Sequence, residues 1–239
     1  MKYQNAQMNI SFQVNSLLQK HGIEAKLTEL TILSKIIKNS IEFNQKLYES
    51  GIDHEVSLAV TVKELIEIYM LRSQIYKKMN YDNEFPEIIK GLNFDEYDEC
   101  SAIVYSKRDV ITGTCRLIFD SSNEKLPIDK KFSLDYLRNQ NKNLCEASRV
   151  IIKDSEGLKP EFKLLTIDSY KILAFFKMDA ISVMTEEHLK LYKNFGGLSV
   201  EKEFQGYGSI DKLFLITLWN TSNISPFFKR IFLRNVSVS

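Results

Sequence analysis

The sequence is poor in the residues that mark disulfide frameworks, metal sites and membrane spans. Only three of its 239 residues are cysteines, and Cys100, Cys115 and Cys145 form no CxxC pair and have no histidine cluster beside them. Neither a zinc site nor a disulfide framework is indicated, and a reducing cytoplasm fits best. The longest apolar stretches, such as Leu173–Phe176 and Leu213–Leu218, are far shorter than the ~20 residues that cross a bilayer. The N-terminal segment is polar, so we expect no signal peptide and a cytoplasmic protein that contacts membranes at most peripherally.

The chain also lacks a surplus of charge of either sign. It has 32 lysines and arginines against 31 aspartates and glutamates, which gives a formal net charge of +1. Proteins that bind nucleic acid usually carry a basic excess on one face, so nucleic acid is not an expected partner. Hydrophobic residues make up 44% and charged residues 26% of the chain, which are ordinary values for a globular protein.

Hydrophobic spacing divides the chain into a helical extension and an α/β domain. Residues 1–52 contain no proline and carry apolar side chains at helical spacing, which predicts one or two amphipathic helices. Strands are then expected at 54–62, 102–105, 111–119, 144–152, 180–184, 198–203 and 213–219, and helices at 63–80, 161–177, 186–195 and 225–234. This order predicts an α/β (α+β) fold, in which a mixed central β-sheet flanked by helices forms a domain over residues 53–239.

Charged side chains interrupt three apolar segments of this domain. Arg72 lies on an otherwise apolar helix stripe, Arg116 lies within a predicted strand, and Glu146 and Arg149 lie within another. Burying an unpaired charge costs several kcal/mol, so each of these groups must be paired or functional. With the loop at 95–98, the segments supply three carboxylates and three guanidinium groups: Asp95, Asp98, Glu146, Arg72, Arg116 and Arg149.

These six groups fit either a structural ion-pair network or an active site, because both gather such residues. On a regular strand, Glu146 and Ser148 would point to one face and Arg149 to the other, unless a β-bulge re-aims one of them. The residues alone leave the two interpretations open.

The order of the charged residues resembles the pattern of acyl-homoserine-lactone synthases, which have a fold like that of the GCN5-related N-acetyltransferases. The pattern extends over about residues 56–200 and comprises Arg72, Tyr76, Asp95-x-x-Asp98, Gly113-x-x-Arg116-Leu117, Phe132 and Glu146-x-x-Arg149. The resemblance implies that the arginine, the two aspartates and the glutamate line the amine side of a cleft. It also implies that an acyl carrier protein thioester is the donor and that the product is an amide.

Two departures favour a related family. Tyr81 stands where those synthases have tryptophan, and they generally lack an extension like residues 1–50. The C-terminal half, with EEHLKLYKNFGGLSVEKE and LITLWNTSNISPFF, is more similar to N-acyl amino acid synthases of the FeeM type. That resemblance implies transfer of a fatty acyl group from an acyl carrier protein to the amine of an amino acid. Alternatives are an acyl-homoserine-lactone synthase that acylates S-adenosylmethionine, and a non-catalytic module of the same fold that binds an acyl ligand or a partner.

The residues also suggest how such a transfer would run. An amino acid is mostly an ammonium ion at neutral pH and has no free lone pair, so the reaction needs a base, for which Glu146 is the candidate. Carboxylates would attract the ammonium, a guanidinium would bind the substrate carboxylate, and backbone N–H groups with Arg149 would stabilise the oxyanion. The catalytic candidates are Glu146, Ser148 and Arg149, and the substrate-binding candidates are Arg72, Tyr76, Asp95, Asp98, Arg116 and Phe132.

The loop after the strand at 144–152 bears on the donor. A coenzyme A enzyme of this fold usually holds the pyrophosphate with a glycine-rich loop at a helix N-terminus. Residues 153–159 carry two acidic side chains, Asp154 and Glu156, and contain one glycine, Gly157, so a phosphopantetheine arm on an acyl carrier protein is the expected donor. Gln205–Gly208 has similar glycine spacing but precedes a strand and is predicted to be a turn. We expect no metal and no redox cofactor.

Overall fold

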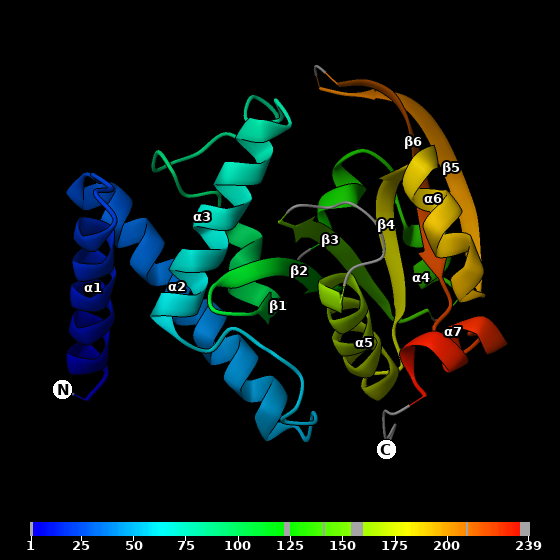
Figure 1. Cartoon of the computed structure of the whole chain (residues 1–239), viewed down its shortest axis with the longest axis horizontal. Helices are drawn as coiled ribbons and strands as arrows, with labels where there is room; N and C mark the ends of the chain where they lie inside the picture. Colours follow the sequence, from blue (N-terminus) through cyan, green and yellow to red (C-terminus); the bar gives the residue numbers. More distant parts are fainter. Residues whose placement is uncertain (1, 122–124, 141, 154–159, 209, 235–239) are drawn as a thin grey trace.

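A six-stranded sheet runs through the centre of the molecule, with helices on both of its faces (Figure 1). The computed structural model describes residues 2–121, 125–140, 142–153, 160–208 and 210–234. The strands are β1 (Ser101–Lys107), β2 (Ile111–Phe119), β3 (Leu144–Ile152), β4 (Asp179–Thr185), β5 (Leu198–Tyr207) and β6 (Ile210–Trp219). Their order in the sheet is β1-β2-β3-β4-β6-β5. The predicted α/β (α+β) class with a mixed central sheet is confirmed.

The middle of the sheet contains its one parallel pairing among the described strands. β3 and β4 run parallel and pair over three positions, Leu144–Glu146 with Asp179–Ile181, whereas the other neighbouring strands are antiparallel. β3 continues to Ile152 alongside β2, and β4 continues to Thr185 alongside β6. Glu146 is therefore the last residue of β3 that pairs with β4.

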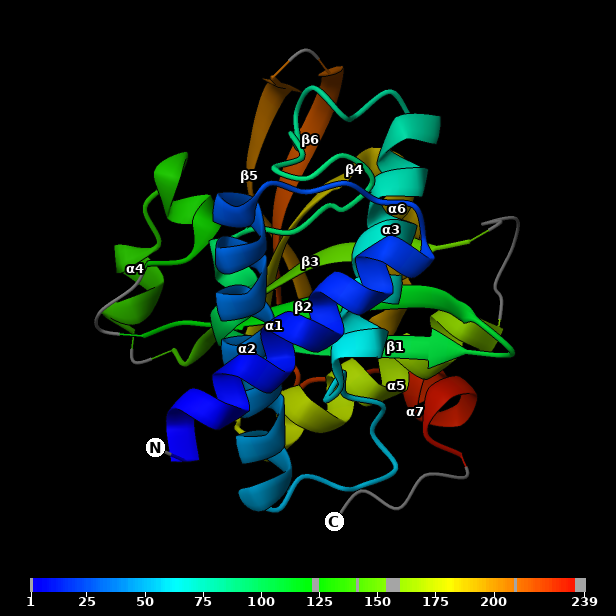
Figure 2. The ribbon, with the colours of Figure 1, turned by 90° about the vertical axis from the view of Figure 1, so that its left-hand side faces the viewer.

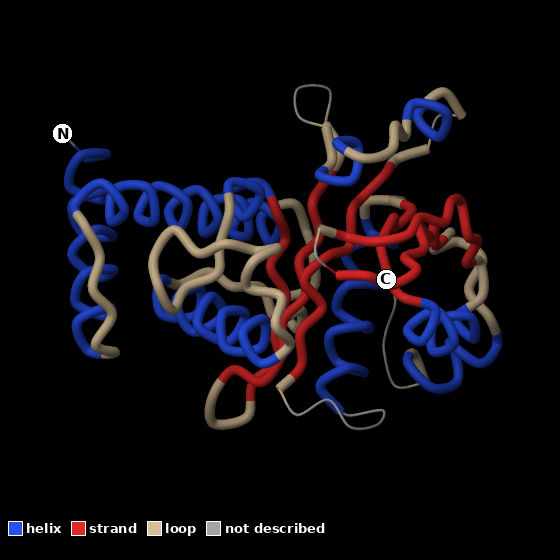
Figure 3. The backbone as a smooth tube through the Cα atoms, turned by 90° about the horizontal axis from the view of Figure 1, so that it is seen from above, coloured by secondary structure: helices blue, strands red, loops and turns tan. Residues whose placement is uncertain are grey.

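The helices form two layers. The first layer holds α1 (Lys2–Lys20), α2 (Leu27–Glu49) and α3 (Val62–Lys78), together with η1 (Glu96–Cys100), η2 (Pro127–Lys130) and α4 (Asp135–Arg138). The second holds α5 (Pro160–Phe175), α6 (Glu186–Tyr192), η3 (Lys193–Phe195) and α7 (Pro226–Phe232). Figure 2 shows α1 and α2 crossing in front of the sheet edge, and Figure 3 shows the sheet between the two groups of helices.

Alternation along the strands assigns side chains to these layers. Ile103 and Ile151 pack with the α1–α3 cluster, whereas Cys115 and Leu117 pack with α5. Ile118 lies on the other side of β2 from Leu117, in a cluster with Leu126 and Leu137 of the segment that contains η2 and α4. Arg116, two residues before Ile118, therefore shares the sheet face covered by α3, η1 and η2.

The helical N-terminal extension is confirmed, but the strand predicted at 54–62 is wrong. This segment makes an isolated bridge, Leu58 with Val104, and otherwise follows turns. The backbone N–H of Ser57 donates to the Asp168 carboxylate of α5 at 3.0 Å instead of continuing a ladder. The turn predicted at Gln205–Gly208 begins later, because β5 extends to Tyr207. Within the described residues, no helix is long and apolar enough to span a membrane.

Candidate active site

The network of charged groups starts from helix α3 and the short helix η1. The Arg72 Nη1 donates to both carboxylate oxygens of Asp98, at 2.9 and 3.0 Å, and neither side chain is exposed. Asp95 caps η1 by accepting a hydrogen bond from the Tyr97 backbone N–H at 3.0 Å. Arg72 thus fixes η1 from behind and has no surface left for a ligand.

Arg116 connects η1 to the sheet. Its Nη1 donates to the Asp95 Oδ1 at 2.5 Å and lies 3.3 Å from the Asp98 Oδ1, and its Nε donates to the Ser148 Oγ at 3.1 Å. Arg116 and Ser148 are register partners on β2 and β3, so the antiparallel ladder itself brings the two side chains together.

A β-bulge on β3 places Arg149 on the same side. Thr114 pairs with Ile151 and Arg116 pairs with Ser148, so β3 holds one extra residue opposite Cys115. Arg149 adopts a φ of 51°, a conformation that is uncommon for residues other than glycine and is typical of bulges and functional sites. The bulge foreseen as an exception to simple alternation is present, and it re-aims Arg149 toward η1.

The re-aimed guanidinium closes the network. The Arg149 Nη2 donates to the Asp95 Oδ2 at 2.5 Å, and its Nη1 donates to the side-chain oxygen of Asn93. Its guanidinium carbon lies 5.7 Å from the ring centre of Tyr76 and 5.4 Å from that of Phe85. The Arg149 Nε is buried without a hydrogen-bond partner among the described residues, which leaves one donor for a bound molecule.

The carboxylates of the site differ in their acidity. Burial by itself would raise the pKa of Asp95, but Arg116 and Arg149 outweigh burial and hold this pKa well below its usual range. Burial likewise opposes the charge on Arg116, yet Asp95 and Asp98 raise its pKa above the ordinary value. These groups therefore stay charged at neutral pH.

Glu146 behaves differently from the two aspartates. Its Oε2 accepts a hydrogen bond from the backbone N–H of Ile128 at 2.9 Å, and 7% of the residue is exposed. Burial raises the pKa of Glu146 to about 7, although the Ile128 N–H and the Arg116 charge both lower it. A carboxyl group with this pKa gains and loses a proton near neutral pH, which is what a general base requires.

Aromatic rings connect α3 to strand β5 beside the network. Tyr76 stacks on Phe85 at 4.6 Å between ring centres, and Phe85 lies 6.1 Å from Tyr207. Phe132 contacts Tyr136 at 5.9 Å and carries the Lys202 ammonium 4.5 Å from its ring centre. Tyr76 is thus part of the site around Arg149, whereas Phe132 contacts α4 and β5 and packs against the cluster that contains Ile118 and Ile128.

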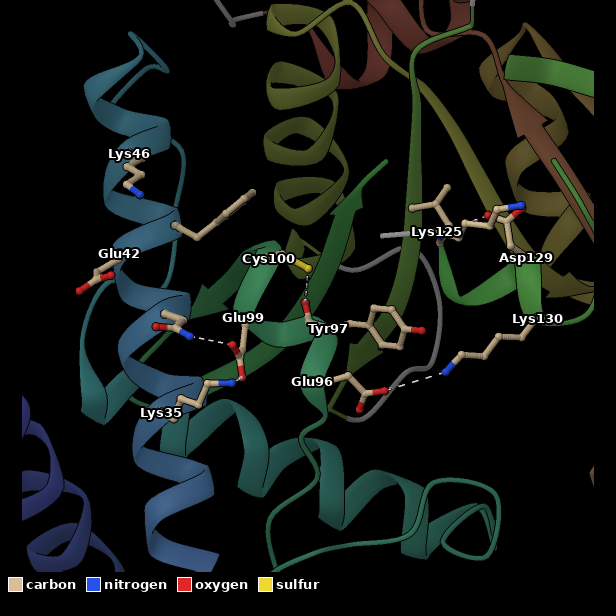
Figure 4. Close-up of a pocket in the computed structure, with 13 residues that line it drawn as sticks. Lys35, Glu42, Lys46, Glu96, Tyr97, Glu99, Cys100, Lys125, Asp129 and Lys130 are labelled. Atoms are coloured by element: carbon tan, nitrogen blue, oxygen red, sulfur yellow. Dashed lines mark hydrogen bonds and ion pairs between the residues drawn. The ribbon is translucent and has the colours of Figure 1, made fainter. Parts of the chain in front are cut away.

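A groove with a volume of about 770 Å³ lies next to the network, between α2, η1 and the segment around η2 (Figure 4). Tyr97 lines it, and the ring centre of Tyr97 lies 6.0 Å from the Arg116 guanidinium carbon. Lysines and carboxylates alternate along its rim, and Figure 4 shows the pairs Lys35–Glu99 and Lys130–Glu96. The groove and the charged network meet across the Tyr97 ring.

The structure brings together most of the side chains that the sequence singled out: Arg72, Tyr76, Asp95, Asp98, Arg116, Glu146, Ser148 and Arg149. Sequence reasoning missed Asn93, Phe85, Tyr207 and the Ile128 amide, and a backbone donor leaves no signal in residue types. The donor loop predicted at 153–159 lies outside the described residues from 154 onward. No group of three or more potential metal ligands occurs among the residues that the structure describes.

Comparisons with known proteins agree with this geometry. Residues 67–217, more than half of the chain, match the family model described as "N-acyl amino acid synthase FeeM". No curated protein sequence gives a significant match. The N-terminal extension and the pocket wall that α2 provides lie outside the matched residues.

Three solved structures show the same fold at low sequence identity. FeeM, an N-acyl amino acid synthase from uncultured soil microbes, has a TM-score of 0.53 at 12% identity, over 76% of this chain and 97% of that chain. The acyl-homoserine-lactone synthase LasI has a TM-score of 0.52 at 16% identity, over 75% and 92%. MesI, described as a CoA-dependent acyl-homoserine lactone synthase, has a TM-score of 0.54 at 14% identity, over 82% and 94%.

Proposed function

We propose that this chain, which belongs to the FeeM family of N-acyl amino acid synthases, transfers a fatty acyl group from an acyl carrier protein thioester to the amine of an amino acid. The observation that carries the proposal is Glu146, a buried carboxyl group with a pKa of about 7, held at the point where β3 and β4 cease to pair. The ion network beside it supplies fixed charges for a zwitterionic acceptor.

The reaction proceeds by direct attack on the thioester. Glu146 takes a proton from the acceptor ammonium, and the free amine attacks the thioester carbonyl carbon. The C–N bond forms, the C–S bond breaks, and the pantetheine sulfur leaves as a thiolate that takes up the proton which the nitrogen loses as the amide forms. The oxyanion of the tetrahedral intermediate needs donors, and the Arg149 Nε is a side-chain donor without a partner among the described residues. Arg72 also has nitrogens without a partner, but its side chain is fully buried, whereas that of Arg149 is 7% exposed.

The remaining candidates hold these groups in place. Asp95 attracts the ammonium, since it is the most exposed of the paired carboxylates, with 24% of its side chain accessible. Asp98 and Arg72 are fully buried and act behind η1. Ser148 orients Arg116 through its hydroxyl group, and Tyr76 supports the Arg149 guanidinium.

Two points of this proposal rest on sequence and need direct tests. The glycine-poor segment after β3 favours a carrier protein over coenzyme A. Among the proteins of similar fold, MesI is described as CoA-dependent, so the donor must be measured. The second candidate function is acylation of S-adenosylmethionine, which the similarity in fold to LasI favours.

Product analysis decides between these functions. The purified protein is incubated with matched acyl-carrier-protein and acyl-coenzyme A donors, in the presence of either a mixture of amino acids or S-adenosylmethionine, and products are identified by mass spectrometry. An N-acyl amino acid supports the proposal, and an acyl-homoserine lactone supports the second candidate. Binding of the acyl carrier protein without any product would identify a non-catalytic module. Glu99→Gln, which changes a carboxylate of η1 that is paired with Lys35, is the control for Glu146→Gln on β3.

A further inference from the structure

The backbone N–H that binds Glu146 belongs to a loop, and side-chain ion pairs hold that loop in place. Ile128, whose N–H binds the Glu146 carboxylate, is the second residue of η2, in a segment that crosses the sheet face between β2 and β3. We infer that Arg138 is a positioning residue for Glu146, because its guanidinium clamps Asp129 and Asp120 and thereby holds the Ile128 N–H against the Glu146 carboxylate. The inference rests on the proposed function, in which Glu146 is the base.

Arg138 makes a denser set of contacts than a surface arginine needs. Its Nε and Nη2 donate to the two oxygens of Asp120, at 2.7 and 2.9 Å. Its Nη1 and Nη2 donate to the two oxygens of Asp129, at 2.9 and 2.6 Å, and its Nη1 also reaches Asp135 at 3.2 Å. Two bidentate pairs on one guanidinium fix the relative position of both carboxylates.

Both clamped carboxylates connect to the site. Asp120 follows β2 directly, and its backbone N–H donates to the Leu144 carbonyl oxygen at the start of β3, at 3.1 Å. Asp129 follows Ile128, and its carboxylate accepts the N–H groups of Leu126 at 3.1 Å and Leu134 at 3.0 Å. Arg138 therefore joins the end of β2 to both sides of the loop that presents Ile128.

The buried carboxylate of Asp129 needs this cation. Its side chain is 4% exposed, and it lies on the wall of the groove opposite α2 (Figure 4). Burial by itself would raise the pKa of Asp129, but Arg138 and the N–H groups of Leu134 and Leu126 lower it. Without Arg138, the loop would hold a buried anion close to Glu146 with no cation to offset it.

The charge on Asp129 also acts on Glu146. The titratable groups that face Glu146 come from several elements: Arg116 of β2, Asp95 at the N-cap of η1, Asp129 of η2 and Tyr207 of β5. Asp129 and Asp95 raise the pKa of Glu146, whereas the Ile128 N–H and Arg116 lower it. Loss of the Arg138 charge leaves the negative charge of Asp129 unbalanced, and loosening of the loop weakens the hydrogen bond from the Ile128 N–H. Both changes should raise the pKa of Glu146.

A second substitution, of the Asp129 carboxylate that Arg138 binds, should lower the pKa of Glu146 instead of raising it. Asp129→Asn removes the negative charge but keeps an oxygen that accepts a loop N–H group, so the pKa of Glu146 should fall. A purely structural role for the clamp predicts a loss of stability in both variants and no opposed shifts in the ionisation of Glu146.

The test measures the pH dependence of kcat/KM for the full chain, whose acidic limb reports the ionisation of the base in the free enzyme. Arg138→Ala should shift this acidic limb to higher pH by about one pH unit, which lowers kcat/KM ~5-fold at pH 7. Most of the activity should return at high pH, where the base is deprotonated. Arg138→Lys, which keeps the charge but loses the two bidentate pairs, should move it less. Asp129→Asn should move the limb down.

Lys142→Ala is the matched control. Lys142 is 24% exposed against 23% for Arg138, and it pairs with Asp179 at 2.9 Å at the same end of the sheet. Its loss should lower stability without moving the limb. A limb that stays in place in Arg138→Ala and Asp129→Asn, or moves equally in Lys142→Ala, overturns the inference.

The same variants are read without catalysis by a ¹³C NMR titration of the Glu146 side-chain carboxyl group. If the wild-type protein forms no amide with any donor, the proposed function fails, and this titration still decides whether Arg138 controls the ionisation of Glu146. If Arg138→Ala does not fold, Arg138→Lys and Asp129→Asn must still give their separate shifts, and their failure to do so overturns the inference.

Discussion

Replacing Glu146 by glutamine should slow acyl transfer and at the same time stabilise the protein at alkaline pH. Glutamine keeps the shape of the side chain and an oxygen that can accept the Ile128 N–H, but it cannot take a proton. Loss of a general base typically lowers the rate ~100-fold or more. The stability effect follows from the raised pKa of the same carboxyl group.

The sign and size of the stability effect follow from proton linkage. The folded protein holds the pKa of Glu146 at about 7, against an ordinary value of 4.5. The folded state therefore binds this proton more tightly than the unfolded chain, so the stabilisation is complete below pH 4.5 and is lost as the pH rises to about 7. At about 1.4 kcal/mol per pKa unit, the wild-type protein loses about 3 kcal/mol of unfolding free energy over this window. Glu146→Gln should not lose it.

Urea unfolding at pH 5 and pH 8, with amide formation measured in parallel, checks both parts. Asp168→Asn is the matched control, because Asp168 is a buried carboxyl group of α5 whose pKa burial raises to about 6, and it binds the Ser57 N–H away from the ion network. It should show a similar gain in stability at pH 8 with normal acyl transfer. A Glu146→Gln protein that is equally destabilised at both pH values, or that forms amide at the wild-type rate, would refute the assignment of Glu146 as a buried general base with a raised pKa.

Three further outcomes are expected. Arg116→Ala breaks a buried ion pair and should cost about 3–5 kcal/mol of unfolding free energy. Its effect on amide formation should not add to that of Asp98→Asn. Additive losses in a double-mutant cycle would show that the two residues act separately. The ratio of kcat/KM for acyl carrier protein to that for coenzyme A carrying the same acyl group should exceed one, and equal values would contradict the donor assignment. Arg116 and Arg149 hold the pKa of Asp95 below its ordinary value of 3.8. The stability that Asp95 contributes is therefore present above pH 3.8 and is lost as the pH falls below it. Asp95→Asn should make the unfolding free energy depend less on pH in this acidic range.

Local patterns in the sequence predicted most of the fold. The helix over α3 follows from the apolar stripe through Leu65, Ile68 and Tyr69 and from the capping residue Thr61. The strand over Leu144–Ile152 was predicted with the bounds of β3. The resemblance to N-acyl amino acid synthases and acyl-homoserine-lactone synthases is confirmed by the family match and by the shared fold.

The parts that the sequence did not predict depend on contacts between distant segments. The stretch at 54–62 alternates like a strand, but the Asp168 carboxylate, 111 residues further along, takes the Ser57 N–H. The bulge at Arg149 was foreseen only as an exception to alternation, because its place depends on the register between β2 and β3, which the composition of β3 alone does not fix. Arg138 and Asp129 lie in a polar segment where carboxylates and cations are ordinary surface residues, and only the folded loop shows that they lie next to Ile128, which binds Glu146.

The structure also explains why one cluster can be both a scaffold and a reaction site. Asp98 and Arg72 are fully buried and form an ion pair with each other, so they hold η1 in place. Among the residues that the structure describes, Glu146 accepts a hydrogen bond only from the Ile128 N–H, so burial dominates its ionisation and leaves its pKa near neutrality. A fully paired Glu146 would be too weak a base, and an unpaired Asp98 would destabilise η1. The division of partners between these carboxylates therefore separates the residues that maintain the site from the residue that we propose moves a proton in it.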